Sequence, residues 1–212
     1  MTGRSYPHPS AESTPHRRGG WQRSRDCWAL FLFVVTAACG SATPAPEPPS
    51  QPTQDLLAQA DAAEKERRYD RAQALYVQAR RQAPDPASGA AAALAHGRAL
   101  IFWGEYEQAE AALAEATRHA PRNPGAWHDL AMVRHERGDL AGAETAFRRS
   151  IAASPRDRRP RLALAALLWK QRRHPDALRE YEALAQLALP ERVHEQVQWA
   201  IATLRRQVMA PD

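Results

Sequence analysis

Small and large apolar residues alternate with polar ones along the middle of this chain, in a pattern that repeats about every 34 residues. The aligned segments begin at Thr53, Ala90, Pro124 and Arg158. The first two begin 37 residues apart, because three residues are inserted near residues 86–88. Each segment has the apolar spacing of two amphipathic helices of roughly 14 residues. A fixed period in this range predicts a stack of helical hairpins rather than a globular enzyme core.

Three positions of the repeat keep one kind of residue. A position in the first helix holds a small residue: Ala60, Gly97, Ala131 and Ala165. A position in the second helix holds alanine: Ala72, Ala109, Ala143 and Ala177. Four residues later comes a large side chain: Tyr76, Leu113, Phe147 and Tyr181. Because small residues let helix axes approach closely, we expect them where helices cross, with the large side chains filling the space between neighbouring helices.

The turns inside the hairpins have their own pattern. Gly104 and Gly138 fall where the first helix of a hairpin ends, which favours a left-handed residue. Arg67 and Arg172 occupy the same position in the first and last segments, so we expect strained turns there. A proline, which cannot continue a helix, closes each segment: Pro84, Pro121, Pro155 and Pro190.

This pattern resembles the tetratricopeptide repeat. The third segment matches it most fully, through Trp127, Leu130, Ala131, Gly138, Leu140, Ala143, Phe147 and Pro155. Outside that segment the tryptophan position holds Leu56, Ala93 and Arg161. The resemblance covers residues 53–190. It implies an all-α fold, a right-handed solenoid of about four helical hairpins.

A further helix is predicted within residues 191–212. An apolar stripe with helical spacing runs along it: Val193, Val197, Ile201, Leu204 and Val208. We expect this helix to cap the solenoid, because the last hairpin would otherwise expose its apolar face. Trp199 lies off the stripe; we expect it to pack under the fourth hairpin, the alternative being an exposed contact residue.

Residues 1–38 have the features of an export signal behind a long leader. The apolar run from Trp28 to Ala38 is too short to span a bilayer, and Arg23 and Arg25 precede it. The run ends at Cys39 in Thr-Ala-Ala-Cys, which resembles a bacterial lipobox although threonine replaces the usual leucine or valine. That resemblance implies that Cys39 is lipidated and becomes the first mature residue. An uncleaved anchor and an ordinary cleaved signal are the alternatives.

Residues 39–52 then form a proline-rich tether with a reach of about 40 Å. Cys27 and Cys39 are the two cysteines of the chain, so residues 40–212 can form no disulfide. The net charge of +5 falls to +2 when residues 1–38 are left out, with 24 basic and 22 acidic residues remaining. We therefore expect no nucleic-acid partner.

No motif of a catalytic site is present in the sequence. It has no phosphate-binding glycine loop, no zinc-protease motif and no nucleophile elbow. His128 and His135 share one predicted helix face but lie about 10.5 Å apart along its axis, too far for one metal ion. We expect no enzyme activity, no metal, no cofactor and no small-molecule substrate.

A partner-binding groove is implied by the resemblance, because in this family the first helices of the repeats line a concave surface. The residues assigned to it are Arg98, Ile101, Phe102, His128, Met132, His135, Trp169 and Lys170. The matching positions of the first segment are Leu57, Asp61, Glu64 and Lys65. Exposed apolar side chains rimmed by polar ones indicate a protein contact.

The interpretation is a lipid-anchored scaffold of the bacterial envelope, on the periplasmic side of the outer membrane. It would hold a protein or peptide partner during assembly of an envelope complex, a function assigned by analogy. Outer-membrane placement is favoured because Gly40, and no aspartate, follows the cysteine. The alternative is a non-catalytic module that regulates or positions a cell-wall enzyme.

Overall fold

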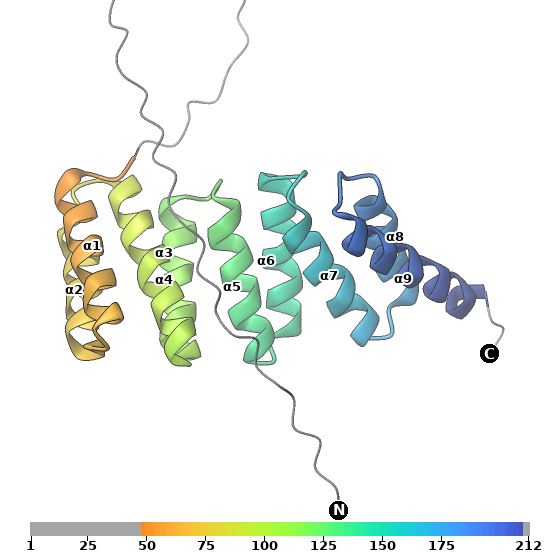
Figure 1. Cartoon of the computed structure of the whole chain (residues 1–212), viewed down its shortest axis with the longest axis horizontal. Coiled ribbons are helices and arrows are strands. Elements are labelled where there is room, and N and C mark those ends of the chain that lie inside the picture. The colour runs from red at the N-terminus through yellow and green to blue at the C-terminus, as the bar shows by residue number, and fades with distance from the viewer. Residues whose placement is uncertain (1–47, 210–212) are drawn as a thin grey trace, which may run out of the picture. The chain divides into compact units, whose positions relative to one another are not determined.

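A computed structural model describes residues 48–209 (Figure 1). This part of the chain is helical throughout: α1 (Gln51–Lys65), α2 (Tyr69–Gln82), α3 (Pro86–Trp103), α4 (Tyr106–His119), α5 (Pro124–Glu136), α6 (Leu140–Ala153), α7 (Arg158–Lys170), α8 (His174–Ala185) and α9 (Glu191–Met209). The predicted leader, Cys39 and most of the tether lie outside the described residues. The first helix, α1, begins two residues inside the predicted tether.

The helices pair as four consecutive hairpins. Helix α1 packs on α2, α3 on α4, α5 on α6 and α7 on α8 (Figure 1). Each hairpin contacts its neighbour, and α9 packs on α8. The predicted all-α solenoid of four hairpins and a closing helix is confirmed. Within residues 48–209, no helix is long and apolar enough to cross a membrane.

The repeated positions lie where the sequence pattern places them. The alanines of both small positions are fully buried, and Gly97 is buried with them. A Cβ atom added at Gly97 would lie 2.6 Å from Cγ of Leu113, so this crossing of α3 and α4 requires glycine. Tyr76, Leu113, Phe147 and Tyr181 are also buried, at 7% exposure or less. Helix spacing in the solenoid therefore depends on these positions.

The hairpin turns confirm the predicted left-handed residues. Gly104 and Gly138 have φ angles of 82° and 83°, and Arg67 and Arg172 have φ angles of 58° and 60°. The Cβ atoms of the arginines make this conformation sterically unfavourable, whereas the glycines have no Cβ atom. The turn geometry is thus set by the hairpin and not by the residue type.

The three inserted residues near position 86 lengthen a helix instead of a loop. They form the first turn of α3, which is 18 residues long and begins with Pro86. The Asp85 carboxylate caps this turn by accepting a hydrogen bond from the Ser88 amide at 2.7 Å. The buried Ser88 hydroxyl in turn accepts a hydrogen bond from the Ser50 amide at 2.8 Å, which ties the start of α1 to α3.

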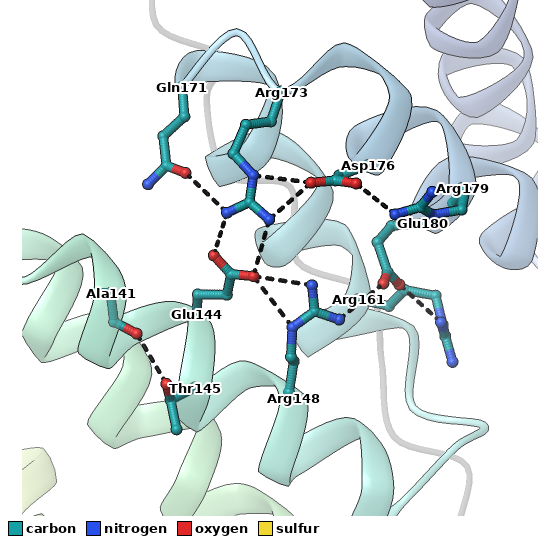
Figure 2. Close-up of polar contacts among 10 residues, drawn as sticks. All are labelled: Ala141, Glu144, Thr145, Arg148, Arg161, Gln171, Arg173, Asp176, Arg179 and Glu180. Atoms are coloured by element: carbon teal, nitrogen blue, oxygen red, sulfur yellow. Dashed lines mark hydrogen bonds and ion pairs between the residues drawn. The ribbon is translucent and has the colours of Figure 1, made fainter.

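A network of ion pairs joins the third and fourth hairpins (Figure 2). Glu144 of α6 accepts hydrogen bonds from Arg148 at 2.9 Å and from Arg173 at 2.5 Å. Glu180 of α8 accepts one from Arg161 at 2.8 Å and pairs with Arg148 at 3.6 Å. Arg148 thus bridges the two carboxylates, and because both are largely buried, the network fixes how α6, α7 and α8 meet.

Candidate partner-binding face

The first helices of the hairpins, α1, α3, α5 and α7, carry the residues assigned to the groove. We call their exposed side, together with Trp199 of α9 beside Trp169, the first-helix face. This face exposes four large apolar side chains: Phe102 (79% exposed), Met132 (38%), Leu162 (37%) and Trp199 (64%). Val208 and Met209 are also exposed, near the end of α9. Lys170 is exposed as well. Ile101, another residue of the predicted groove, is half-buried and packs against the core.

An ion pair between neighbouring first helices occupies the middle of this face. Arg98 of α3 donates a hydrogen bond through Nε to the Asp129 carboxylate of α5 at 2.6 Å. On α5, His135 lies 3.3 Å from the carboxylate of Glu136. Arg98 and His135 were both assigned to the groove, and both have partners within the protein.

His128 is more buried than we expect of a residue that contacts a partner. Its ring is 5.8 Å from that of Phe147, and its Nδ1 atom is shielded from solvent without a hydrogen-bond partner. Burial lowers the pKa of His128 below its usual value. The imidazole is therefore neutral at pH 7 and contributes mainly to packing.

A cleft of about 210 Å³ lies where α7 and α9 meet, lined mainly by apolar side chains. The Trp169 ring in this cleft is 5.9 Å from both Tyr181 and Trp199. Trp169 is half-buried, so it is partly a core residue and not the freely exposed anchor that the groove assignment implied. The expectation that Trp199 packs under the fourth hairpin is wrong: one side of its indole contacts Trp169, but the side chain is mostly exposed, because the buried stripe of α9 is Val197, Ile201 and Leu204.

A second cleft, of about 350 Å³, lies between α1 and α3 and is lined by both polar and apolar side chains. Its lining includes Asp61, Glu64, Tyr76, Arg98 and Phe102. The Tyr76 hydroxyl lies 2.9 Å from Asp61 and 3.2 Å from Glu64. Burial raises the pKa of Glu64, and the nearby Asp61 charge adds to this, while the Tyr76 hydrogen bond opposes it. The repeat alignment placed both acids on this face, but it gave no sign that Tyr76 of α2 would join them.

Over residues 48–209 no three histidine, aspartate or glutamate side chains gather closely enough to hold a metal ion. The arrangement instead offers two clefts and a row of exposed apolar side chains, which suit the binding of an extended segment or helix.

A model of the tetratricopeptide repeat matches residues 94–158 of the sequence. A comparison with curated proteins finds no match. Among solved structures, the MamA protein superposes with a TM-score of 0.63 at 16% identity, over 73% of this chain and 81% of that chain. YrrB, described as a tetratricopeptide protein with an unusual peptide-binding site, has a TM-score of 0.59 at 17% identity, over 72% and 76%.

PilF of Pseudomonas aeruginosa has a TM-score of 0.58 at 20% identity, over 74% of each chain. At these identities the structural likeness concerns the fold. The sequence match covers the second and third hairpins, and the structure extends the same hairpin to the first and the fourth. Residues 94–158 therefore match the tetratricopeptide repeat in sequence, and residues 48–209 have the helical solenoid fold of the solved structures.

Proposed function

We propose that this protein is a non-catalytic scaffold that binds a segment of a partner protein along its first-helix face. The observation that carries the proposal is the row of exposed large apolar side chains Phe102 of α3, Met132 of α5, Leu162 of α7 and Trp199 of α9. Such a row on one face is typical of a protein contact. The peptide-binding site named for YrrB, which shares the fold, agrees with this function.

The proposal includes tethering to a bacterial envelope membrane through lipid on Cys39, with the outer membrane as the favoured site. Its support is the short apolar run that ends in Ala-Ala-Cys. A scaffold held in this way would keep its partner at the membrane during assembly of an envelope complex.

Replacing Phe102 with alanine tests the binding face. The ring is 79% exposed, so Phe102→Ala should leave the melting midpoint unchanged. If Phe102 anchors the partner, capture of envelope proteins by the purified chain should weaken by about thirtyfold, since a central aromatic contributes about 2 kcal/mol or more. Met209→Ala, at 82% exposure near the end of α9, is the matched control and should capture normally. Equal capture by both variants would place the contact elsewhere.

Trp169→Ala is a less clean test than its groove position suggested. Because Trp169 packs on Tyr181 and Trp199, its truncation should lower both capture and stability.

Replacing Cys39 with serine tests the membrane tether. In cells, Cys39→Ser should move the protein to the soluble fraction or leave the leader uncleaved, because the lipid would be lost. Mass spectrometry of membrane-extracted wild-type protein should show lipid on Cys39. An unmodified Cys39 in that fraction would refute the tether.

A further inference from the structure

We propose that the cleft between α1 and α3 binds an arginine side chain of the partner segment. This inference rests on the proposed function and specifies the chemistry at one end of the first-helix face. The cleft is lined by Asp61 and Glu64 of α1, Tyr76 of α2, and Arg98 and Phe102 of α3. Its volume of about 350 Å³ leaves room for one long side chain.

The hydrogen-bond donors in this cleft do not match its acceptors. Tyr76 has one hydroxyl proton, and the carboxylates of Asp61 and Glu64 both lie within hydrogen-bond distance of it. One proton serves one acceptor at a time, so one carboxylate is always without this donor. The Glu64 Oε1 atom is shielded from solvent and has no partner among the described residues. An acceptor left in this state is costly, and a ligand that donates hydrogen bonds removes the cost.

Elsewhere in residues 48–209, carboxylates that are as buried as Glu64 either form an ion pair or cap a helix. Those in ion pairs with arginine are Glu110, Glu115, Asp129, Glu144, Asp157, Asp176, Glu180 and Glu182. Asp85 caps α3 instead. Among the half-buried carboxylates of residues 48–209, Glu64 alone has neither an arginine partner nor a helix to cap. Because a cation is missing at this one site, we infer that the partner segment supplies it.

The neighbouring cation does not fill this role. Arg98 lines the cleft, but its Nε donates to Asp129, so its charge is already opposed by a carboxylate. Asp61 and Glu64 therefore leave an excess of negative charge between α1 and α3. A cationic side chain complements that charge in a way that an apolar or acidic one does not.

Phe102 favours arginine over lysine as the occupant. Its ring lies on the wall of the cleft and is 79% exposed, so a flat cation can stack on it. A guanidinium also presents several N–H donors in one plane, which suits two neighbouring carboxylates better than the point charge of an ammonium group. The cleft thus offers both an aromatic surface and paired acceptors.

Peptide selection on the full chain tests this inference. Random dodecapeptides selected for binding should be enriched in arginine, and replacing that arginine with citrulline, which has the same shape but no charge, should weaken binding at least about tenfold. Lysine in its place should bind less well than arginine. The double variant Asp61→Asn/Glu64→Gln should lose the same factor. Asp70→Asn/Glu107→Gln, which removes two exposed acids from the second helices, is the charge-matched control and should bind normally.

The outcomes separate this inference from the proposed function. Peptides that bind and are weakened by Phe102→Ala, yet tolerate citrulline and the Asp61/Glu64 variant, would overturn the arginine site and leave the binding face standing. Equal affinity for lysine and arginine would overturn the role of the Phe102 ring. If no peptide binds, both proposals fail. Thermal melts should show that both double variants are folded at the temperature of the binding assay, so that a loss of binding is not a loss of fold.

Discussion

At the scale of single residues, the solenoid depends on alanines that no larger side chain can replace. Ala143 of α6 is fully buried, so Ala143→Leu should overpack the hairpin and lower the free energy of unfolding by about 1–3 kcal/mol. Ala141, two residues earlier on the same helix, is exposed. Ala141→Leu should change stability by less than about 0.5 kcal/mol. Equal denaturation midpoints for both variants would mean that the repeat register is wrong.

A buried histidine makes stability depend on pH. His96 of α3 is 2% exposed, its Nδ1 lies 3.0 Å from Arg80, and its Nε2 lies 3.0 Å from the Gln73 amide oxygen. Because arginine can only donate, Nδ1 accepts and the ring is neutral. Burial, with the adjacent Arg80 charge, lowers the pKa of His96 to about 4.

The sign of the effect follows from linkage. Between pH 6.5 and about 4 the unfolded chain binds a proton that folded His96 does not, so stability falls as the pH is lowered through this range. The free energy of unfolding should be about 2 kcal/mol lower at pH 5 than at pH 7. His96→Gln should remove most of this dependence; the smaller part due to His128, whose pKa is also lowered, should persist. A wild-type stability that does not change over this range would contradict the neutral buried His96.

At the scale of helices, the ion pairs between hairpins differ in what they contribute. Glu180 of α8 pairs with Arg161, and both side chains are largely buried, at 15% and 17% exposure. Glu180→Ala would leave Arg161 without this partner, so we expect a loss of about 1–2 kcal/mol in unfolding free energy. Glu182 on the same helix pairs with the exposed Arg205, and Glu182→Ala should cost less than about 0.5 kcal/mol. Similar losses in chemical denaturation would show that burial does not set the value of these pairs.

The helices themselves follow from the sequence because their boundaries depend on local chemistry. Left-handed turns at Gly104 and Gly138, small residues such as Ala143 and closing prolines such as Pro155 act over a few residues, and each is visible in the repeat. The inserted residues 86–88 show the limit. The repeat register showed that they were extra, but not that they would extend α3 by one turn.

The candidate site was less predictable for a physical reason. The repeat placed its residues on the first helices of the hairpins, but their exposure depends on which neighbouring helix they meet. Trp169 packs on Tyr181, and Arg98 pairs with Asp129 of the next hairpin. Glu64 is unpaired because no cationic side chain of α1, α2 or α3 pairs with it. Contacts of this kind arise between repeats, and a single repeat pattern does not contain them.

At the scale of the whole molecule, we expect the partner to dock on the first-helix face. The two faces of the solenoid can be compared directly by replacing single exposed residues with a photoreactive amino acid. Phe102 of α3 and Met132 of α5 sample the first-helix face, and Gln78 of α2 and Thr145 of α6 sample the second helices. Each variant would be crosslinked in intact cells, and adducts would be detected by a shift in mass.

We expect a common adduct from Phe102 and Met132 and none from Gln78 or Thr145. The same adduct should disappear from the Met132 position when Phe102→Ala is added, because both side chains would contact one bound segment. Adducts from Gln78 or Thr145 with none from Phe102 and Met132 would contradict docking on the first-helix face and place the partner on the second helices.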